Sequence, residues 1–202
     1  MKVSQYVACQ GFPCADVKHE CHIVPDIDIA PEKMSLVMIS EAAPESPADY
    51  YYAGGSPLFE QTTVQAFKDA GADVTSMQDI IGLGVYCTTA VKCGKTGYGI
   101  KSGTIEECSK LLEKELALFP NIRVFMLMGD VAIKAVNYIA RRAGEGRVIP
   151  AGSTYKIRGQ EYFFRGKRAF PSYLQAGPSF FIEKSKRRMI AEDIKAAMQL
   201  VK

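Results

Sequence analysis

Six cysteines, at positions 9, 14, 21, 87, 93 and 108, have the side chains best suited to bind a metal in this sequence. Two of them bracket a glycine-rich connection. Cys93 ends the apolar run VYCTTAV, and Cys108 follows a loop with four glycines between positions 94 and 103. Thiolates bind soft metals and iron–sulphur clusters. A metal or cluster can therefore close this pair, although two unrelated thiols would give the same spacing.

Three further cysteines lie in residues 1–33, which have little periodicity and are interpreted as an irregular N-terminal wrap. The N-terminus lacks the apolar core of a signal peptide, which favours a cytoplasmic location. Thiols stay reduced there, so metal or cluster ligation is favoured over disulfides. The spacing matches neither a zinc ribbon nor a bacterial ferredoxin. Cys87 lies within an apolar strand and is interpreted as a core thiol.

Apolar strands and amphipathic helices alternate along the chain. We expect strands at 35–40, 84–92, 122–128 and 168–173, and helices at 58–70, 105–119, 130–142 and from 179 to the C-terminus. Thr104 and Glu107 predict a capping box at the start of the second helix. Residues 154–164 predict a hairpin that turns at Arg158–Gly159. The strands are continuously apolar, as in sheets covered on both faces. The sequence predicts one α/β domain over 1–202, a three-layer αβα sandwich with a mostly parallel four-stranded central sheet.

Composition allows a soluble globular protein, with 48% hydrophobic and 23% charged residues among 202. No apolar run approaches the roughly 20 residues that span a membrane. The net charge of +3 neither requires nor excludes an anionic partner. Basic residues do gather late in the chain, in RGKR at 165–168 and KSKRR at 184–188.

Ligands of open parallel sheets bind beyond the carboxyl ends of the strands. The four ends here fall at 41–53, 88–93, 129–130 and 171–177. In this order they resemble the uracil-DNA glycosylase superfamily, and most closely its iron–sulphur-containing family 4 branch. ISEAAP at 39–44 matches a strand followed by GEAPG, VYCTTAVKC at 85–93 matches VYITNVVKC, LMGDVA at 127–132 matches a strand ending in LG, and FPSYLQA at 170–176 matches HPSYLLR.

The resemblance, which covers about 35–200, implies a [4Fe–4S] cluster on four thiolates. Cys93 and Cys108 match two ligands, and Cys9 and Cys14 are the better N-terminal pair. CQGFPC has four residues between its cysteines where the family has two, so Cys21 stays a reserve ligand in place of Cys9. Structural thiols, or zinc assisted by the nearby residues His19 and His22, remain alternatives.

The resemblance also implies a pocket for a base swung out of DNA. Glu41 takes the place of the acidic residue beside the sugar, and Ala42 and Ala43 would line that wall. Tyr52, or Tyr51 in a shifted alignment, lies near the stacking phenylalanine of the family. Without the resemblance, Glu41 would be interpreted as a helix-capping or solvated loop carboxylate.

Two motif positions depart from the family. Thr89 replaces the asparagine that reads the uracil edge, and one hydroxyl cannot give the same bidentate contact. Phe170 replaces the histidine that stabilises the anionic uracil oxygen, and is also interpretable as core or pocket wall. Losing one oxyanion donor costs about 2.7–4 kcal/mol of barrier. Weak uracil excision, a shifted base specificity and loss of activity are all open hypotheses.

DNA, single- or double-stranded, is the expected partner of an expected monomer. The PSYLQAG loop would contact DNA through Ser172 and Leu174, the latter as an apolar wedge at the vacated base. Lys167 and Arg168 would contact phosphates, as would the basic residues at 186–188, although a solvated helix face explains the latter equally well. Two alternatives remain: a non-catalytic nucleic-acid-binding member that keeps the cluster, and a flavodoxin-like small-molecule binder.

Overall fold

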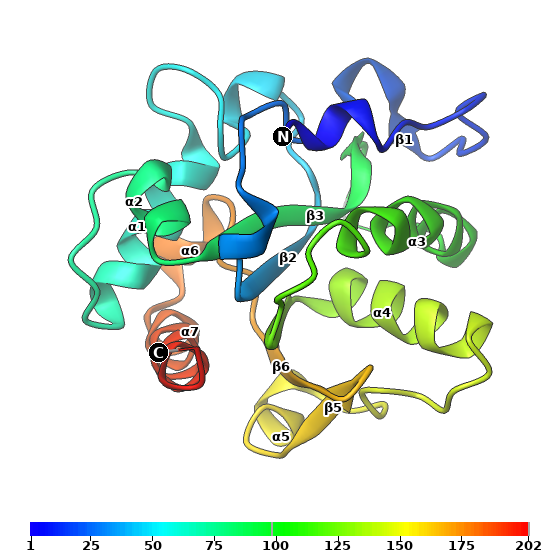
Figure 1. Cartoon of the computed structure of the whole chain (residues 1–202). Helices are drawn as coiled ribbons and strands as arrows, with labels where there is room; N and C mark the ends of the chain where they lie inside the picture. Colours follow the sequence, from blue (N-terminus) through cyan, green and yellow to red (C-terminus); the bar gives the residue numbers. More distant parts are fainter. Residues whose placement is uncertain (98, 202) are drawn as a thin grey trace.

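A computed structural model describes residues 1–97 and 99–201, and within them the chain forms an α/β structure around a six-stranded mixed sheet (Figure 1). The strand order is β1-β3-β2-β4-β6-β5. The strands are β1 (Val17–Lys18), β2 (Leu36–Ala43), β3 (Val85–Lys95), β4 (Val124–Met128), β5 (Tyr162–Phe164) and β6 (Lys167–Ser172). The inner strands β3, β2, β4 and β6 pair in parallel, and the edge strands β1 and β5 are antiparallel.

The predicted α/β class is confirmed, but the sheet has six strands in the described residues rather than four. The two extra strands are short edge strands of two and three residues. Strands of that length carry no readable alternation of apolar and polar residues, so periodicity could not predict them.

Helices cover both faces of the sheet (Figure 1). The helices are α1 (Leu58–Asp69), α2 (Met77–Gly82), α3 (Ser102–Leu116), α4 (Asp130–Arg142), α5 (Thr154–Ile157), α6 (Ser179–Ile182) and α7 (Lys184–Gln199). One apolar core joins α3 and α4 to the sheet, and a second joins α1, α2 and α7 to the other face. Among the described residues, none of these helices combines the length and apolarity needed to traverse a bilayer.

Three local predictions are wrong. Residues 154–157 form α5, and the hairpin is made by β5 and β6, which turn at Arg165 and Gly166 with positive φ angles of 50° and 71°. The helix from 179 is broken at Glu183 into α6 and α7. Thr104 does not cap α3, which begins at Ser102. Instead the Thr104 hydroxyl donates to the carboxylate of Asp16, a contact 88 residues apart that no local pattern reveals.

Asp16 fastens the N-terminal wrap to the start of α3. Its carboxylate accepts the backbone N–H of Lys101 at 2.7 Å as well as the Thr104 hydroxyl. A carboxylate at a helix N-terminus accepts hydrogen bonds from free N–H groups and interacts favourably with the positive end of the helix dipole. The next residues form β1, where Val17 pairs with Lys95 at the end of β3. The wrap, which carries three cysteines, is thus held against β3 and α3.

A fully buried ion pair joins β3 to α3. The ammonium of Lys92 contacts the carboxylate of Glu115, and both side chains have zero exposure. Lys92 also donates to the Thr88 hydroxyl at 2.8 Å and to the Thr89 carbonyl at 2.7 Å. Glu115 accepts the hydroxyls of Tyr86 at 2.6 Å and Thr88 at 2.8 Å. All three ammonium protons have acceptors, which is the condition for a buried charge to be tolerated.

We expect Lys92→Met to lower the free energy of unfolding by about 3–5 kcal/mol, because it leaves Glu115 charged and buried without a partner. Lys92→Met combined with Glu115→Leu should recover most of that loss, since neither charge then remains. Urea denaturation measures all three proteins. As a control, Lys110→Met breaks an exposed pair with Glu107 and should cost less than about 1 kcal/mol. A cost below 1 kcal/mol for Lys92→Met would contradict the role given to the pair.

Candidate active site at the carboxyl edge of the sheet

A cavity of about 320 Å³ opens at the carboxyl edge of the sheet. Several predicted site residues line it: Glu41, Ala42 and Ala43 at the end of β2, and Leu174 in the loop after β6. The remaining walls come from the 44–59 segment, from Lys95 and from 176–178. Its volume lies at the lower end of the roughly 300–1,000 Å³ typical of ligand pockets. Four predicted residues, from two separate motifs, therefore share one cavity.

The Glu41 carboxylate lies directly over the backbone of Gly129. A Cβ atom built on Gly129 would come within 2.6 Å of Glu41 Oε1, so only glycine fits at this point. Gly129 has a φ of 96° and precedes the first turn of α4. It also donates its N–H to the Ser172 carbonyl at 2.9 Å. The ends of β2, β4 and β6 thus meet beneath Glu41.

Positive charge lies close to the Glu41 carboxylate. The N-terminus of α4, a helix of 13 residues, carries partial positive charge from its free N–H groups. Lys95 Nζ lies 3.9 Å from Glu41 Oε2, and the Glu41 side chain is 18% exposed. A charged carboxylate that still reaches solvent can orient a water molecule beside a bound ligand.

The predicted base-reading residues Thr89 and Tyr52 do not line this cavity. Thr89 is completely buried, and its hydroxyl has no hydrogen-bond partner in the described residues. Tyr52 donates its hydroxyl proton to the Cys87 carbonyl at 2.9 Å and accepts the Cys87 N–H at 3.0 Å. Both side chains lie behind the cavity, on the side of the sheet that α1 and α7 cover.

Tyrosines 50 and 51 fill the space between Thr89 and the cavity wall. Burial raises the pKa of the Tyr50 hydroxyl, and the nearby Thr89 hydroxyl partly opposes that rise. Tyr51 shares a hydrogen-bond network with Ser40 at 2.5 Å and Gln175 at 3.1 Å. Its ring packs 5.2 Å from Phe59, which lines the cavity. In this conformation the three-tyrosine sequence closes off the site predicted to read the base.

Phe170 and Ser172 are also buried away from the cavity. Phe170 lies in the core on the α7 side, and the Arg168 guanidinium packs 4.4 Å from its ring centre. The Ser172 hydroxyl has zero exposure and donates to Asp193 at 2.5 Å. Burial raises the pKa of Asp193, while its contacts with Arg158 and Ser172 lower it. The structure therefore favours core packing for Phe170 and offers no DNA contact from Ser172 in this conformation.

The predicted phosphate contacts Lys167 and Arg168 lie at the wrong edge of the sheet. They begin β6, where Arg168 pairs with Val124 at the start of β4. Five residues of strand at about 3.3 Å each separate Lys167 from the carboxyl edge. The Arg168 guanidinium is also occupied by the carbonyls of Tyr162 and Ala169, at 3.2 and 3.0 Å.

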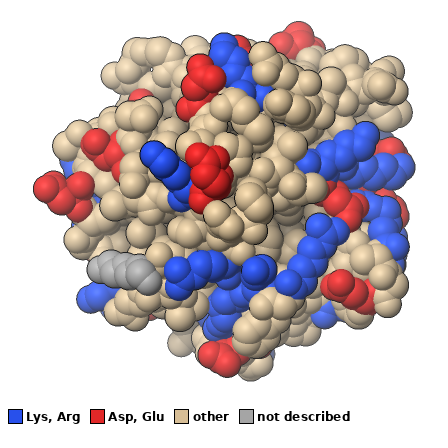
Figure 2. Space-filling view, viewed as in Figure 1, with Lys and Arg blue, Asp and Glu red and all other residues tan. Residues whose placement is uncertain are grey.

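Several cations of the molecule are likewise paired within the protein. In the KSKRR segment, Lys186 contacts Glu183, Arg187 contacts Asp69, and Arg188 lies 3.7 Å from Glu192. On the face seen in Figure 2, Lys and Arg side chains gather over the lower and right-hand part, with acidic side chains among them. This pairing favours the solvated-face interpretation of 186–188.

Five of the six cysteines influence one another at the junction of the wrap, β3 and α3. Burial raises the pKa of Cys93 to about 12, and the neighbouring thiols of Cys108, Cys9, Cys14 and Cys21 contribute to that rise. Burial also raises the pKa of Cys108 to about 11, although a hydrogen bond from the Lys92 backbone opposes the rise. No three potential ligands in the described residues already stand together as a metal site. Thiols from three separate segments nonetheless lie close enough to raise the pKa of Cys93.

Both candidates for the fourth thiol, Cys9 and Cys21, add to the raised pKa of Cys93, whose main cause is burial. The Cys21 thiol also donates to the Glu45 carbonyl at 3.1 Å, which favours Cys9 as the fourth ligand. His19 Nε2 lies 2.5 Å from the Cys14 carbonyl. His22 Nε2, by contrast, is buried with no partner among the described residues, so the zinc alternative rests on His22.

Sequence reasoning missed two side chains of the cavity, Phe59 and Lys95. Phe59 fits the apolar spacing of α1, which predicts a core position; it is 8% exposed, packs in the core and also lines the cavity. Lys95 lies two residues beyond the matched VKC motif. The strand was predicted to end before it, whereas β3 continues to Lys95 because β1 pairs with it.

Comparison with known proteins adds no assignment: no family model matches the sequence, and no curated protein matches it. The resemblance to the uracil-DNA glycosylases therefore depends on the motifs alone.

The contact between Gly129 and Glu41 predicts a coupled pair of substitutions. Gly129→Ala should cost about 1–2 kcal/mol of backbone strain, because φ is positive, and about 1–3 kcal/mol more because the new methyl group meets Glu41. Gly144→Ala is the matched control, since its φ is also positive and the described atoms leave open space around it. In a Glu41→Ala background, Gly129→Ala should cost no more than this control. Equal costs in both backgrounds, measured by thermal unfolding, would show that the contact is absent.

Proposed function

We propose that this chain receives a nucleotide extruded from DNA at the Glu41 cavity and hydrolyses the bond between a deaminated base and deoxyribose. The observation that carries the proposal is the position of Glu41. Its carboxylate lies at the meeting point of three strand ends, over Gly129 and the N-terminus of α4, inside a cavity also lined by Ala42, Ala43 and Leu174. These are the positions that the motif resemblance assigns to the sugar-facing wall and the DNA-inserting loop.

The reaction places definite demands on this site. The glycosidic bond breaks with its electron pair leaving on the base, and the oxygen of a water molecule bonds to the sugar carbon. The proton that this water loses passes through Glu41 or solvent to the departing base anion. Glu41 orients that water and stabilises the positive charge that develops on the sugar. Phe59 supplies an apolar wall against which the base can stack. The products are a free base and an abasic site.

Catalysis by this site is expected to be weak. Thr89 and Phe170 offer nothing to the cavity, and a donor for the departing base is missing from both motif positions. One such donor is worth roughly a hundred- to a thousandfold in rate. A second candidate function is a non-catalytic nucleic-acid-binding protein. The tyrosines at 50 and 51, which cover Thr89, favour it.

Excision of uracil from oligonucleotides distinguishes the two candidates. With enzyme in excess, the wild-type protein should convert uracil sites to alkali-labile abasic sites. Glu41→Gln should lower the single-turnover rate by about a hundredfold or more, because the amide cannot stabilise positive charge or take up a proton. Glu32→Gln, an exposed carboxylate outside the cavity, should leave the rate unchanged. Binding without any strand scission by the wild-type protein would select the non-catalytic function.

The proposal includes a [4Fe–4S] cluster held by Cys9, Cys14, Cys93 and Cys108. The fit rests on the donor set: four cysteines from three separate segments, of which Cys9, Cys14 and Cys108 all lie close enough to Cys93 to raise its pKa beyond the effect of burial. When bound, the cluster supplies a rigid inorganic cross-link. The residues of this chain then hold the wrap against β3 and α3, and so fix the 41–45 wall of the cavity through the contact of Cys21 with Glu45.

Iron content tests the assignment of the thiols. Protein purified without oxygen should contain iron and acid-labile sulphide, and Cys93→Ala or Cys108→Ala should lose most of both because each removes a ligand. Cys87→Ala is the control. That thiol is buried on the other face of β3, so its removal should cost stability and leave the iron bound. Zinc in place of iron, or equal iron in all three variants, would reject the assignment.

A further inference from the structure

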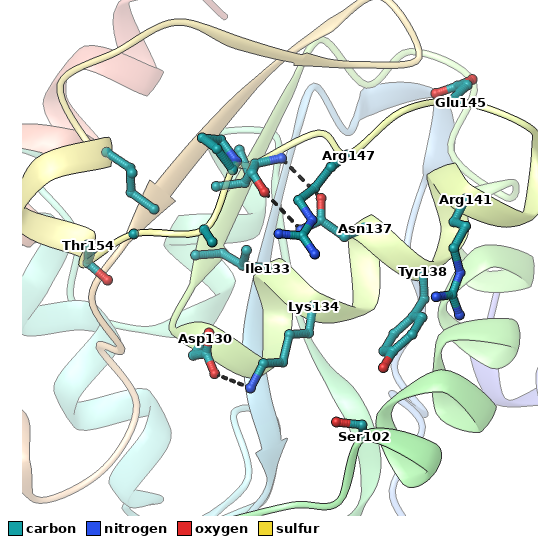
Figure 3. Close-up of a pocket in the computed structure, with 15 residues that line it drawn as sticks. Ser102, Asp130, Ile133, Lys134, Asn137, Tyr138, Arg141, Glu145, Arg147 and Thr154 are labelled. Atoms are coloured by element: carbon teal, nitrogen blue, oxygen red, sulfur yellow. Dashed lines mark hydrogen bonds and ion pairs between the residues drawn. The ribbon is translucent and has the colours of Figure 1, made fainter.

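A second and larger cavity, of about 410 Å³, lies along the outer surface of α4 (Figure 3). It is enclosed by α4, by Ser102 at the start of α3, and by the 145–154 segment that returns toward α5. One end is at Asp130, the neighbour of the glycine that supports Glu41. Neither the motif resemblance nor the proposed excision assigns a role to this cavity.

The cavity wall is held in place by the side chain of Asn137. Its amide donates to the Ile149 carbonyl at 3.0 Å and accepts the Ile149 N–H at 3.0 Å. Ile149 is completely buried, and Gly152 packs so closely on Ile157 that a Cβ would lie 2.9 Å from that side chain. The 147–152 segment is thus fixed on α4, and the cavity does not need a ligand to shape it.

One cation at this cavity is free to bind an anion. Lys134 contacts Asp130 at 2.5 Å, and Arg141 contacts Glu106 at 2.6 Å. Arg147 has no acidic partner in the described residues, and Figure 3 shows it reaching back over α4 beside Asn137. Two carboxylates, those of Asp130 and Glu145, also line the cavity, and the Asp130 carboxylate is paired with Lys134. An arginine in this position matches the geometry of a phosphate, with Lys134 able to exchange its exposed partner for the ligand.

An aromatic ring lines the same cavity. The Arg141 guanidinium packs 4.8 Å from the ring centre of Tyr138, which fixes the ring from one face. Tyr138 is also a wall residue of the cavity, one turn along α4 from Lys134. Aromatic side chains at such positions stack nucleic-acid bases with little regard to sequence. A stacking ring and a free guanidinium therefore face one preformed space.

We infer that this cavity binds a nucleotide, with its base against Tyr138 and its phosphate on Arg147 and Lys134. A free nucleoside monophosphate and a nucleotide flanking the extruded one in a DNA strand offer this same chemistry. Because Asp130 adjoins Gly129, a strand entering the Glu41 cavity would pass this site. Only the strand source rests on the proposed function; nucleotide binding itself does not require excision.

Calorimetric titration with dAMP, deoxyadenosine and inorganic phosphate tests the inference. The wild-type protein should bind dAMP more tightly than it binds deoxyadenosine or inorganic phosphate. Arg147→Gln should weaken dAMP binding by roughly tenfold or more, because a charge-assisted pair is lost. Tyr138→Leu should remove the advantage of dAMP over phosphate, and Tyr138→Phe should retain it. Lys110→Gln, which changes an exposed cation on α3 outside the cavity, is the control and should bind as the wild type does.

A second titration uses a single-stranded oligonucleotide with one uracil and separates the two sources. If the strand is the ligand, Arg147→Gln weakens oligonucleotide binding in both the wild-type and the Glu41→Gln background, whether or not uracil is excised. If free nucleotide is the ligand, only the dAMP titration responds. If uracil is not excised but oligonucleotide binding still depends on Arg147, the proposed function is rejected and the nucleotide-binding inference stands. Binding of dAMP and oligonucleotide that is unchanged by Arg147→Gln and Tyr138→Leu, or absent, would overturn the inference.

Discussion

The buried ion pair between Lys92 and Glu115 is the constraint on which the arrangement of both the cysteine site and the Glu41 cavity depends. It fixes the end of β3 to the last turn of α3, and Cys93 and Cys108 lie on those same two elements. The ammonium and the carboxylate are both hydrogen-bonded within the protein, so the pair specifies one relative position of strand and helix rather than adding bulk stability. The N-terminal wrap then packs on this frame through Asp16, and the wall of the Glu41 cavity packs on the wrap through Cys21.

Most of the α/β framework was readable in the sequence, because its signals are local. The runs SLVMIS and IRVFMLM are buried on both faces of the sheet and predict β2 and β4 without ambiguity. What failed depended on partners far away in the chain. Edge strand β1 and the last residues of β3 are strands because they pair with each other, and the Thr104 hydroxyl donates to Asp16 instead of capping its own helix. Such contacts span 76 or more residues, and no local pattern carries them.

The candidate site was predicted in part for a similar reason. Glu41 and Leu174 follow strand ends, and parallel strands bring their ends together whatever the loops do, so these residues do meet in one cavity. The roles of Thr89, Tyr52 and Phe170 required knowledge of what fills the space behind that cavity. The tyrosines at 50–52 fill it, through hydrogen bonds to Ser40, Gln175 and the Cys87 backbone. Lys167 and Arg168 begin β6, and the direction of that strand puts them at the amino edge of the sheet, away from the cavity.

The central claim is that the carboxyl edge of this sheet receives a nucleotide beside Glu41. A crystal structure of the Glu41→Gln protein with a uracil-containing oligonucleotide tests it most directly. The account predicts the uracil nucleotide between the 41–45 wall, Phe59 and Leu174, with its sugar next to residue 41. An oligonucleotide bound elsewhere, with this cavity filled only by water, would contradict it.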